Sequence, residues 1–431
     1  MEINKDVICT YCGCVCDDLE IQTEGQQVLA TKYACAVANE KFLVCQKERN
    51  IDSLLRVGGD LVKAGLDETI ERAAQILAAA RYPLLYGWSN TSCETIKVGL
   101  ELAELVGGLI DNTSSVCHGP GIEAVQEIGE VSSTLGQIRH RADLVIYWGC
   151  NPNSGHIRHM SRYTLARGRF RSSRRDRKVI VVDVRGTPTS KAGDEFIKLE
   201  PGVDFEFLTA LRMAIRDEEL EVEKVAGVPV SKIEELADLM VNAQFGVLFF
   251  GLGLTMSRGK CENVAAALSL VDELNSRTKF VLMPMRGHHN VTGANNVFTW
   301  QTGYPFAVDF SHGYPRYNPG ETSSVDSLVR GDFDAALVVA SDPAANFPKS
   351  AVVNLSRIPL VVVDPSLSAT ALLADVVIPV AFLGVECPGT IYRMDGVPFN
   401  TKKIVEPPSN CLSDTVILQR ILMRVKELKG V

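Results

Sequence analysis

The chain concentrates cysteines near its amino terminus, in the stretch CTYCGCVCDD that begins at residue 9. Cys9, Cys12 and Cys16 are spaced closely enough for three soft thiolates to share one metal centre. Cys35 or Cys45 could supply a fourth ligand. Four cysteine thiolates suit a cubane iron–sulfur cluster or a tetrahedral zinc ion. The spacing favours the cluster, which would make this an electron-transfer protein, and leaves zinc and a segment without metal as alternatives.

The other cysteines and the absence of a targeting signal indicate a reducing compartment. The opening MEINKDVICT lacks the regions of a secretory signal, and the most apolar run, QFGVLFFGLGL, is too short to span a bilayer. We therefore predict a cytoplasmic protein whose 12 cysteines serve metal binding or catalysis instead of disulfides. Cys14 has single-residue spacing to its neighbours and is expected to pack rather than to bind metal.

Composition and charge exclude some classes of function. With 431 residues, 46% apolar and 22% charged, the chain is typical of a soluble globular protein of two to four domains. A net charge of −8 argues against general nucleic-acid binding. One dense basic run, GRFRSSRRDRK from Gly168, is interpreted as a solvated loop.

Two further stretches carry side chains that could take part in catalysis. Cys117 and His118 precede a Gly-Pro turn that can open a helix. A thiol at a helix start has a lowered pKa and can act as a nucleophile or soft-metal ligand, although a buried structural cysteine is an alternative. Arg286 follows the apolar segment KFVLMPM in a glycine-bearing loop, where it could bind a carboxylate or phosphate, or form an ordinary salt bridge. His288 and His289 are interpreted as loop residues.

Short apolar segments that end at Gly, Asn, Asp or Pro alternate with helical stretches through most of the chain. This alternation predicts parallel sheets covered by helices, an α/β fold. An internal repeat supports it. Residues 143–152 align with 334–343, 191 positions apart, and residues 181–199 align with 362–380, 181 positions apart. The first copy therefore has ten extra residues between its two strands, and the basic run lies among them.

The ends of these strands are candidate binding sites. In each copy one strand ends at Asn-Pro or Asp-Pro, and another ends at Asp before a loop of small residues. Open α/β sheets bind ligands at strand carboxyl ends, where free N–H groups meet phosphates. We expect two nucleotide-like ligands, or one held between the two copies; a duplicated fold without ligands is the alternative. No GxGxxG motif is present, and GLGLTMSRGK from Gly251 is weak evidence for a phosphate site by itself.

Together these stretches resemble the B-type subunit of formylmethanofuran dehydrogenase, in the family of molybdenum/tungsten bis-pyranopterin guanine dinucleotide oxidoreductases that includes formate dehydrogenases. The motifs that carry the resemblance are CTYCGCVCDD, YACAVANEKF, LYGWSNT, DNTSSVCHGP, YWGCNPNSGHIRHMSR, FFGLGLTMSRGK, PMRGHHNVTGANNV, RYNPGET and GTIYRMDGVP. They span Cys9 to Pro398, almost the whole chain.

The resemblance implies a small iron–sulfur domain followed by two related Rossmann-like α/β domains of mostly parallel sheet. We place the iron–sulfur domain at residues 1–53, one α/β domain at 54–135 together with 330–431, and the second at 136–329. Larger relatives continue into a carboxyl-terminal β-barrel that closes over the dinucleotides. Here the chain ends at Val431, so we expect a separate small subunit to supply that cover.

The resemblance also implies ligands for a [4Fe–4S] cluster and for the active-site metal. The cluster would be held by Cys9, Cys12, Cys16 and Cys35, because YACAVANEKF matches the segment in which relatives place the fourth ligand. Many relatives have Arg or Lys and then Gly after that cysteine, whereas residues 36–38 read Ala-Val-Ala here.

The family's molybdenum or tungsten ligand falls on Cys117. By the same resemblance His118 handles protons and Arg286 orients the one-carbon substrate. Two pterin dinucleotides would be held by the loops at Asn151, Asp183, Thr187, Gly251, Gly253, Asp342, Asp364 and Thr370. Among these, Asp183 and Asp364 are the candidates for guanine N–H groups, and the two glycines for a phosphate.

The implied function is reduction of CO2 to formate at a molybdenum or tungsten bis-pterin centre, with electrons from the cluster. An amidohydrolase-like subunit would then condense formate with methanofuran, and polyferredoxin-like subunits would deliver electrons. We expect neither nucleic acid nor membrane as a partner. Alternatives are a stand-alone formate dehydrogenase, a non-catalytic scaffold subunit, or a zinc-stabilised NAD-dependent dehydrogenase, which the missing GxGxxG disfavours.

Overall fold

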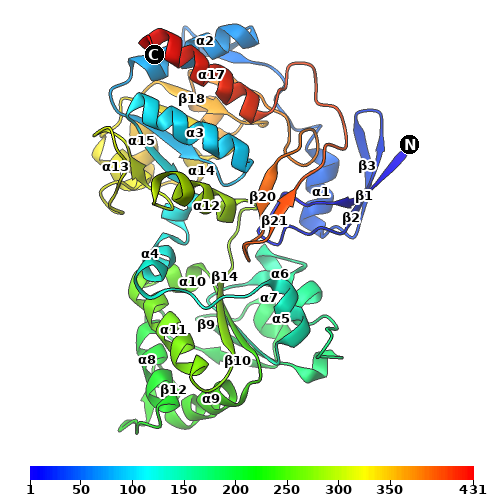
Figure 1. The fold of residues 1–431 in the computed structure, drawn as a ribbon, viewed down its shortest axis with the longest axis vertical. Coiled ribbons are helices and arrows are strands. Elements are labelled where there is room, and N and C mark those ends of the chain that lie inside the picture. The colour runs from blue at the N-terminus through cyan, green and yellow to red at the C-terminus, as the bar shows by residue number, and fades with distance from the viewer. The chain divides into compact units, whose positions relative to one another are not determined.

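The computed structural model describes residues 1–431, which form two compact units (Figure 1). Unit 1 consists of Met1–Val116, His288–Arg393 and Pro398–Val431, and unit 2 of Cys117–Gly287 and Met394–Val397. These limits differ from the expected domain limits for residues 117–135 and 288–329. A separate iron–sulfur domain over residues 1–53 stays a prediction. No helix has both the length and the apolar character needed to cross a membrane.

The main sheet of unit 1 has nine strands in the order β16-β15-β7-β6-β17-β18-β19-β4-β5. Its strands are β4 (Leu54–Val57), β5 (Asp60–Lys63), β6 (Pro83–Gly87), β7 (Leu109–Asn112), β15 (Val308–Asp309), β16 (Arg316–Tyr317), β17 (Ala335–Val339), β18 (Leu360–Val363) and β19 (Val376–Ile378). The five strands from β7 to β19 are parallel, and both edges are antiparallel. The predicted parallel core is confirmed, within a mixed sheet.

Helices cover both faces of this sheet. They are η1 (Thr113–Val116), α2 (Leu66–Ala79), α3 (Cys93–Val106), α12 (Val291–Thr302), α13 (Ser324–Arg330), α14 (Pro343–Asn346), α15 (Lys349–Leu355), α16 (Ala369–Leu373) and α17 (Asp414–Lys429). Leu85 and Leu337 pack with α2, α3, α12 and α17, whereas Leu84 and Val338 pack with α13, α15 and α16. Because successive strand side chains face opposite ways, a strand buried on both faces is apolar throughout.

Smaller elements complete unit 1. An antiparallel sheet of β1 (Glu2–Val7), β2 (Leu19–Glu24) and β3 (Gln27–Lys32) is followed by α1 (Ala36–Val44), and β20 (Thr390–Tyr392) pairs with β21 (Pro398–Asn400). The loop that contains Cys9, Cys12 and Cys16 connects β1 to β2.

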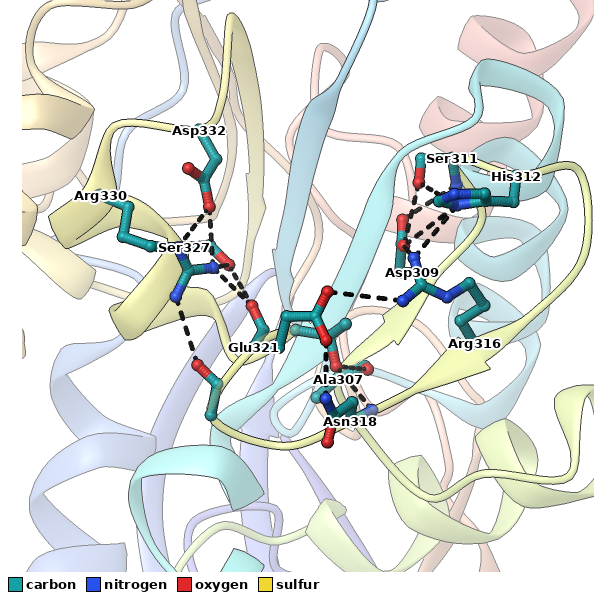
Figure 2. Close-up of polar contacts among 12 residues, drawn as sticks. Ala307, Asp309, Ser311, His312, Arg316, Asn318, Glu321, Ser327, Arg330 and Asp332 are labelled. Carbon is teal, nitrogen blue, oxygen red and sulfur yellow. Dashed lines mark hydrogen bonds and ion pairs between the residues drawn. The ribbon is translucent and has the colours of Figure 1, made fainter.

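The segment between β15 and α13 carries the RYNPGET motif and is fixed by polar contacts (Figure 2). The Arg316 guanidinium donates to the Asp309 carboxylate at 3.3 Å, and the Asn318 amide donates to Glu321 at 2.6 Å. Since β15 also pairs with β7, residues 288–329 pack in unit 1 and not with the second α/β domain in which the sequence placed them.

Unit 2 is an open sheet of five parallel strands in the order β10-β9-β8-β13-β14. The strands are β8 (Leu144–Trp148), β9 (Lys178–Asp183), β10 (Glu195–Lys198), β13 (Gly246–Phe250) and β14 (Phe280–Pro284), with a separate ladder of β11 (Lys224–Val225) and β12 (Val228–Pro229). The helices are α4 (Gly119–Ile128), α5 (Leu135–Arg141), α6 (Pro152–Gly155), the π-helix η2 (Met160–Thr164), the 3-10 helix η3 (Arg174–Asp176), α7 (Pro188–Ala192), α8 (Asp204–Ile215), α9 (Val230–Asn242), α10 (Leu252–Thr255) and α11 (Lys260–Asn275).

Each unit has one topological switch point, where the chain stops adding strands on one side of the sheet and continues on the other. In unit 2 this point lies between β8 and β13, and in unit 1 between β6 and β17. Loops that leave the carboxyl ends of two such neighbouring strands diverge, which opens a crevice for ligands in folds of this type. The loops after β8 and β13 and after β6 and β17 are therefore the places where a ligand site is expected.

Candidate functional site

Cys117 is the first residue of unit 2 and lies just before α4. Its carbonyl accepts a hydrogen bond from Thr255 Oγ1 at 2.9 Å, which ties it to α10. The predicted lowering of the thiol pKa is wrong: burial raises the pKa of Cys117 to about 11, and the charge of Arg286 opposes this only in part. The free thiol is therefore protonated at neutral pH. A soft metal ion could replace that proton, because coordination deprotonates a thiol outright.

His118 caps α4 and is buried beside Cys117. Its Nε2 lies 3.3 Å from the carbonyl oxygen of Met285. Because a carbonyl can only accept, Nε2 carries the hydrogen and Nδ1 keeps its lone pair. Nδ1 is buried without a hydrogen-bond partner. Burial lowers the pKa of His118 to about 3, with a further contribution from the charge of Arg286, so the imidazole is neutral. An orphaned acceptor at this position fits a site that holds a further group.

Arg286 follows β14 in a tight turn, in which its N–H donates to the Pro284 carbonyl at 3.1 Å. Its own carbonyl accepts a hydrogen bond from His156 Nε2 at 2.8 Å. Burial lowers the pKa of Arg286, while the carboxylate of Glu130 and then, where it is ionised, Cys117 oppose this change. Burial in turn raises the pKa of Glu130, and the Arg286 charge opposes that. The thiol, imidazole and guanidinium that the sequence singled out are thus electrostatic neighbours within unit 2.

Glu130 and His156, which both act on Arg286, were not among the residues predicted to form the site. Glu130 is a single acidic residue outside any motif, so nothing in the sequence marked it. His156 lies in the quoted motif YWGCNPNSGHIRHMSR, and its position there was the available signal. Burial lowers the pKa of His156, so its ring donates to the carbonyl of Arg286 as a neutral group.

The four cysteines expected to bind an iron–sulfur cluster lie in unit 1. The Cys9 N–H donates to the Cys16 carbonyl at 2.8 Å, which closes the loop between β1 and β2. Burial raises the pKa of Cys9, and repulsion from Cys16, Cys12 and, less strongly, Cys35 adds to the rise. All twelve cysteines of the chain are free thiols. Cys9 thus interacts electrostatically with the other three thiols, and four cysteine thiolates are the donor set that a [4Fe–4S] cluster requires.

The two candidates for the fourth ligand lie at opposite ends of α1. Cys35 begins the helix, and its sulfur accepts from a first-turn N–H at 3.4 Å. Cys45 ends it, with its thiol donating to the Phe42 carbonyl at 3.6 Å. Cys14 is buried in the same loop, and its hydrogen bond to Cys12 lowers the pKa of Cys12 to about 7. No three His, Cys, Asp or Glu side chains are arranged ready to hold a metal ion, so these assignments stay predictions.

The candidate nucleotide loops of unit 2 are built around Asn151, Asp183 and Thr187. Asn151 begins α6, and its Oδ1 accepts from Thr189 Oγ1 at 2.6 Å. Asp183 ends β9, and its carboxylate accepts from an N–H two residues on at 3.3 Å. Thr187 caps α7 in a reciprocal capping box. The hydroxyl of Thr187 is thus used for the helix, and Thr189 contacts the strand-end side chain.

In unit 1 the corresponding loops contain Asp342, Asp364 and Thr370. Asp342 begins α14, and its Oδ1 accepts from the Thr370 N–H at 2.9 Å and the Thr370 Oγ1 at 2.6 Å. Burial raises the pKa of Asp364 to about 7, and the charges of Asp342 and Asp414 add to the rise. Thr370 therefore corresponds to Thr189. The alignment of the repeat pairs the same two threonines, and Thr187 is instead the cap of α7.

Gly251 and Gly253, the candidates for a phosphate, lie at the unit 2 switch point. The Gly253 N–H donates to the Gly149 carbonyl at 2.9 Å. A Cβ on Gly253 would lie 2.6 Å from Gly149 Cα, and one on Gly251 would lie 2.6 Å from Cys150 Cβ. The loops after β8 and β13 thus touch through their backbones, and glycine is required for that contact whether or not a phosphate binds.

Comparison with known proteins defines the class first. The family of molybdopterin oxidoreductases matches residues 60–424. Two solved structures have the same fold: the formyltransferase/hydrolase complex FhcABCD from Methylorubrum extorquens with methylofuran (TM-score 0.72, 24% identity, 88% of this chain and 100% of that one) and acetylene hydratase from Pelobacter acetylenicus (TM-score 0.74, 15% identity, 98% and 69%).

A nearer relative defines the group within that class. The B-type subunit of the tungsten-containing formylmethanofuran dehydrogenase 2 of Methanocaldococcus jannaschii is 49% identical over 433 residues, which cover 99% of this chain and 100% of the relative. The chain belongs to the molybdopterin oxidoreductase family and, within it, to the B-type subunits of formylmethanofuran dehydrogenase. The resemblance seen in the sequence is confirmed, and the protein is one component of a multisubunit enzyme.

Proposed function

We propose that this chain is the catalytic subunit of its complex and interconverts CO2 and formate at a tungsten or molybdenum centre. The observation that carries the proposal is the grouping of the Cys117 thiol, the neutral His118 ring and the Arg286 guanidinium in one buried region of unit 2. The name of the Methanocaldococcus relative specifies tungsten. A bound metal bis-pterin group supplies a two-electron acceptor, and Cys117 would give it a soft sulfur ligand.

Arg286 binds and orients the substrate in this proposal. Formate is a planar anion, and a guanidinium can donate two parallel hydrogen bonds to its two oxygens. The burial that lowers the pKa of Arg286 also removes competing water, so the attraction for an anion is stronger than at a surface. Glu130 partly balances the charge of Arg286 before substrate binds.

His118 is suited to accept the proton that leaves formate on oxidation. Its tautomer is set by the Met285 carbonyl, so the lone pair of Nδ1 is available. A neutral imidazole with a free acceptor is the required state of a general base. In the direction of CO2 reduction the same atom would hold the proton that is delivered.

The cofactors of the proposal are two molybdopterin guanine dinucleotides and one [4Fe–4S] cluster. The cluster would be held by Cys9, Cys12, Cys16 and Cys35. The dinucleotides would be held by the strand-end loops of both units, at Asn151, Asp183, Thr187, Gly251, Gly253, Asp342, Asp364 and Thr370. Carboxylates at such loops can accept guanine N–H groups, and backbone amides can donate to phosphates.

Partners complete the reaction in this proposal. An amidohydrolase-like subunit would condense formate with methanofuran, a small β-barrel subunit would cover the pterins, and polyferredoxin-like subunits would supply electrons. The structure of FhcABCD, in which a chain has the same fold, is that of a formyltransferase/hydrolase complex, which supports assembly with other subunits. Free thiols in every cysteine position accord with a cytoplasmic location.

Substitution of Arg286 tests the proposal on the anaerobically purified complex. We expect Arg286→Ala to lower kcat/KM for formate oxidation at least ~100-fold, because an anchor for the reacting anion is lost. Tungsten or molybdenum content, read by elemental analysis, should not change. Arg286→Lys keeps the charge without the two-pronged geometry and should recover only part of the activity. Wild-type formate oxidation by Arg286→Ala at unchanged metal content would overturn the proposal.

A further inference from the structure

The basic run Gly168–Lys178 has no part in the site described above. It lies in the connection from β8 to β9 of unit 2, where this copy of the repeat has ten more residues than the copy in unit 1. In unit 1, β17 and β18 pair in parallel without such an insertion. The insertion is therefore not needed to form the sheet, and its composition calls for a different explanation.

Several arginines of this connection fix its backbone. The buried Arg177 donates to the carbonyls of the last two residues of η2 at 2.9 and 3.0 Å, and also to the carbonyl of Arg139. The Nε of Arg171 donates to the Arg141 carbonyl at 2.9 Å. These acceptors are main-chain carbonyl groups, so the bonds themselves neutralise no charge. Three other contacts do: Arg171 pairs with Asp143 at 3.2 Å, Arg174 with Asp194 at 2.8 Å and Lys178 with Glu195 at 3.1 Å.

Five side chains on the outside of this framework form what we name the arginine surface: Arg141, Arg167, Arg169, Phe170 and Arg175. Its four arginines are exposed and make no ion pair. The guanidinium groups of Arg141 and Arg169 lie 5.1 and 5.8 Å from the ring centroid of Phe170. Phe170 itself is 57% exposed. Contact with the ring of Phe170 therefore holds the two guanidinium groups in place at the surface, next to an exposed aromatic side chain.

Gathering so many like charges is unfavourable for the isolated chain. Besides burial, the charges of Arg171, Arg139 and Arg174 contribute to lowering the pKa of Arg177, while the carboxylate of Asp176 opposes them. The whole chain has a net charge of −8, so the basic character is confined and does not reflect composition. A negatively charged surface placed against it would remove the repulsion.

We propose that the arginine surface is the docking site for an acidic face of another subunit of the complex. Arginine and aromatic residues are enriched at the centres of protein interfaces, and a guanidinium pairs with carboxylates in a defined geometry. Nucleic acid fits less well, because the acidic remainder of the chain repels a long run of phosphates. This inference concerns assembly and requires only membership in a multisubunit enzyme.

Charge reversal tests the docking site. The complex is purified through a tag on this chain and washed with increasing NaCl, and the retained subunits are identified by mass spectrometry. For Arg167→Glu/Arg169→Glu/Arg175→Glu we expect one subunit to dissociate at a NaCl concentration at least about three-fold lower than for wild type. The matched control is Lys198→Glu/Lys224→Glu/Lys279→Glu, which reverses three exposed lysines of unit 2 that make no ion pair.

The outcome that overturns the proposal is release of the same subunits at the same salt from both variants. Formate oxidation should be unchanged in both, which separates a failure of docking from a failure of the proposed chemistry. As a second test, p-benzoylphenylalanine in place of Phe170 is irradiated in the intact complex. We expect a cross-link to an Asp- and Glu-rich peptide of another subunit. Cross-links only within this chain, or binding of a 30-nucleotide RNA that the arginine variant alone loses, would refute the proposal.

Discussion

The two copies of the repeat, one in each unit, share their local geometry and differ in chemistry. Asn151 in unit 2 and Asp342 in unit 1 begin short helices with nearly equal backbone angles, φ −126° and ψ 75° against φ −126° and ψ 73°. In both copies a threonine hydroxyl, of Thr189 or Thr370, donates to that side chain at 2.6 Å. The difference is that unit 1 has a carboxylate where unit 2 has a neutral amide.

The comparison shows that the shape of the strand end does not depend on its charge. Backbone conformation and one threonine hydrogen bond fix the shape, and either Asn or Asp satisfies them. In unit 1 the carboxylates of Asp342 and Asp364 interact, whereas unit 2 has the neutral amide of Asn151 at the position of Asp342. If the strand-end loops of both units hold dinucleotides, as proposed, the ligand groups at Asn151 and at Asp342 meet unlike charge.

The largest loss of unfolding free energy is expected from substitutions just before β8 and β17, where the two copies are most alike. Asp143 accepts from the N–H groups of Gln244 and Phe245 at 2.8 and 2.9 Å. The equivalent Asp334 accepts from two successive N–H groups, at residues 81 and 82, at 2.8 and 2.9 Å. Asp143→Ala or Asp334→Ala should each lower the free energy of unfolding by about 3 kcal/mol, because two backbone donors lose their partner.

Urea unfolding of the purified chain measures this pair of effects. The matched controls are Asp143→Asn and Asp334→Asn, which keep one acceptor oxygen and should show about half the loss. A loss in one unit that exceeds the other more than about three-fold would break the equivalence of the copies.

A smaller effect is expected from the threonines that contact the strand-end side chains. Thr189→Val and Thr370→Val remove the hydroxyl and keep the shape, and each should cost about 1.5 kcal/mol of unfolding free energy. The change at Thr370 should be the larger of the two, because its hydroxyl donates to a charged group. Thermal unfolding midpoints of both variants test the order, and Thr187→Val, which only uncaps α7, is the control. Equal losses would show that the charge of Asp342 does not strengthen the contact.

The smallest expected effect is on how the stability of the protein changes with pH. Burial, with the charges of Asp342 and Asp414, raises the pKa of Asp364 to about 7. The folded state therefore binds a proton that the unfolded chain releases, so stability falls as the pH rises from about 4 to about 7. Asp342→Asn removes one charge and keeps the contact with Thr370, as Asn151 does in unit 2. The variant should lose less stability across this window, by no more than about 1 kcal/mol.

Thermal unfolding of wild type and Asp342→Asn at about pH 5 and pH 8 measures the difference in that window. Asn151→Asp is the converse control, because it gives unit 2 the carboxylate that unit 1 has at Asp342. A constant difference between Asp342→Asn and wild type at both pH values would contradict the assigned coupling.

The fold could be predicted because apolar strands and the repeat are local features. Leu337 and Val338 belong to a run that is buried on both faces, and such runs are visible without a structure. The limits of the units were not predictable in the same way. Residues 288–329 join unit 1 through pairing of β15 with β7, and a two-residue strand leaves no pattern in the sequence.

The candidate site could be predicted only in part. Cys117, His118 and Arg286 were found because their motifs resemble a known family, and the structure brings them together. The raised pKa of Cys117 was missed, because burial outweighs the effect of a helix start and cannot be read from neighbouring residues. Glu130 was missed since a long-range electrostatic partner has no sequence spacing to reveal it.

The contact between Gly149 and Gly253 has a consequence for how this enzyme can be altered. Gly149 and Gly253 contact each other through main-chain atoms, which have no rotamers to rearrange. If a dinucleotide binds at this switch point, as proposed, a change in ligand preference is expected to come from side chains such as Asn151 and Asp183 and not from the contact between the two glycines. Variants at Asn151 and Asp183 that keep Gly149, Gly251 and Gly253 should stay folded, whereas variants at these glycines should not.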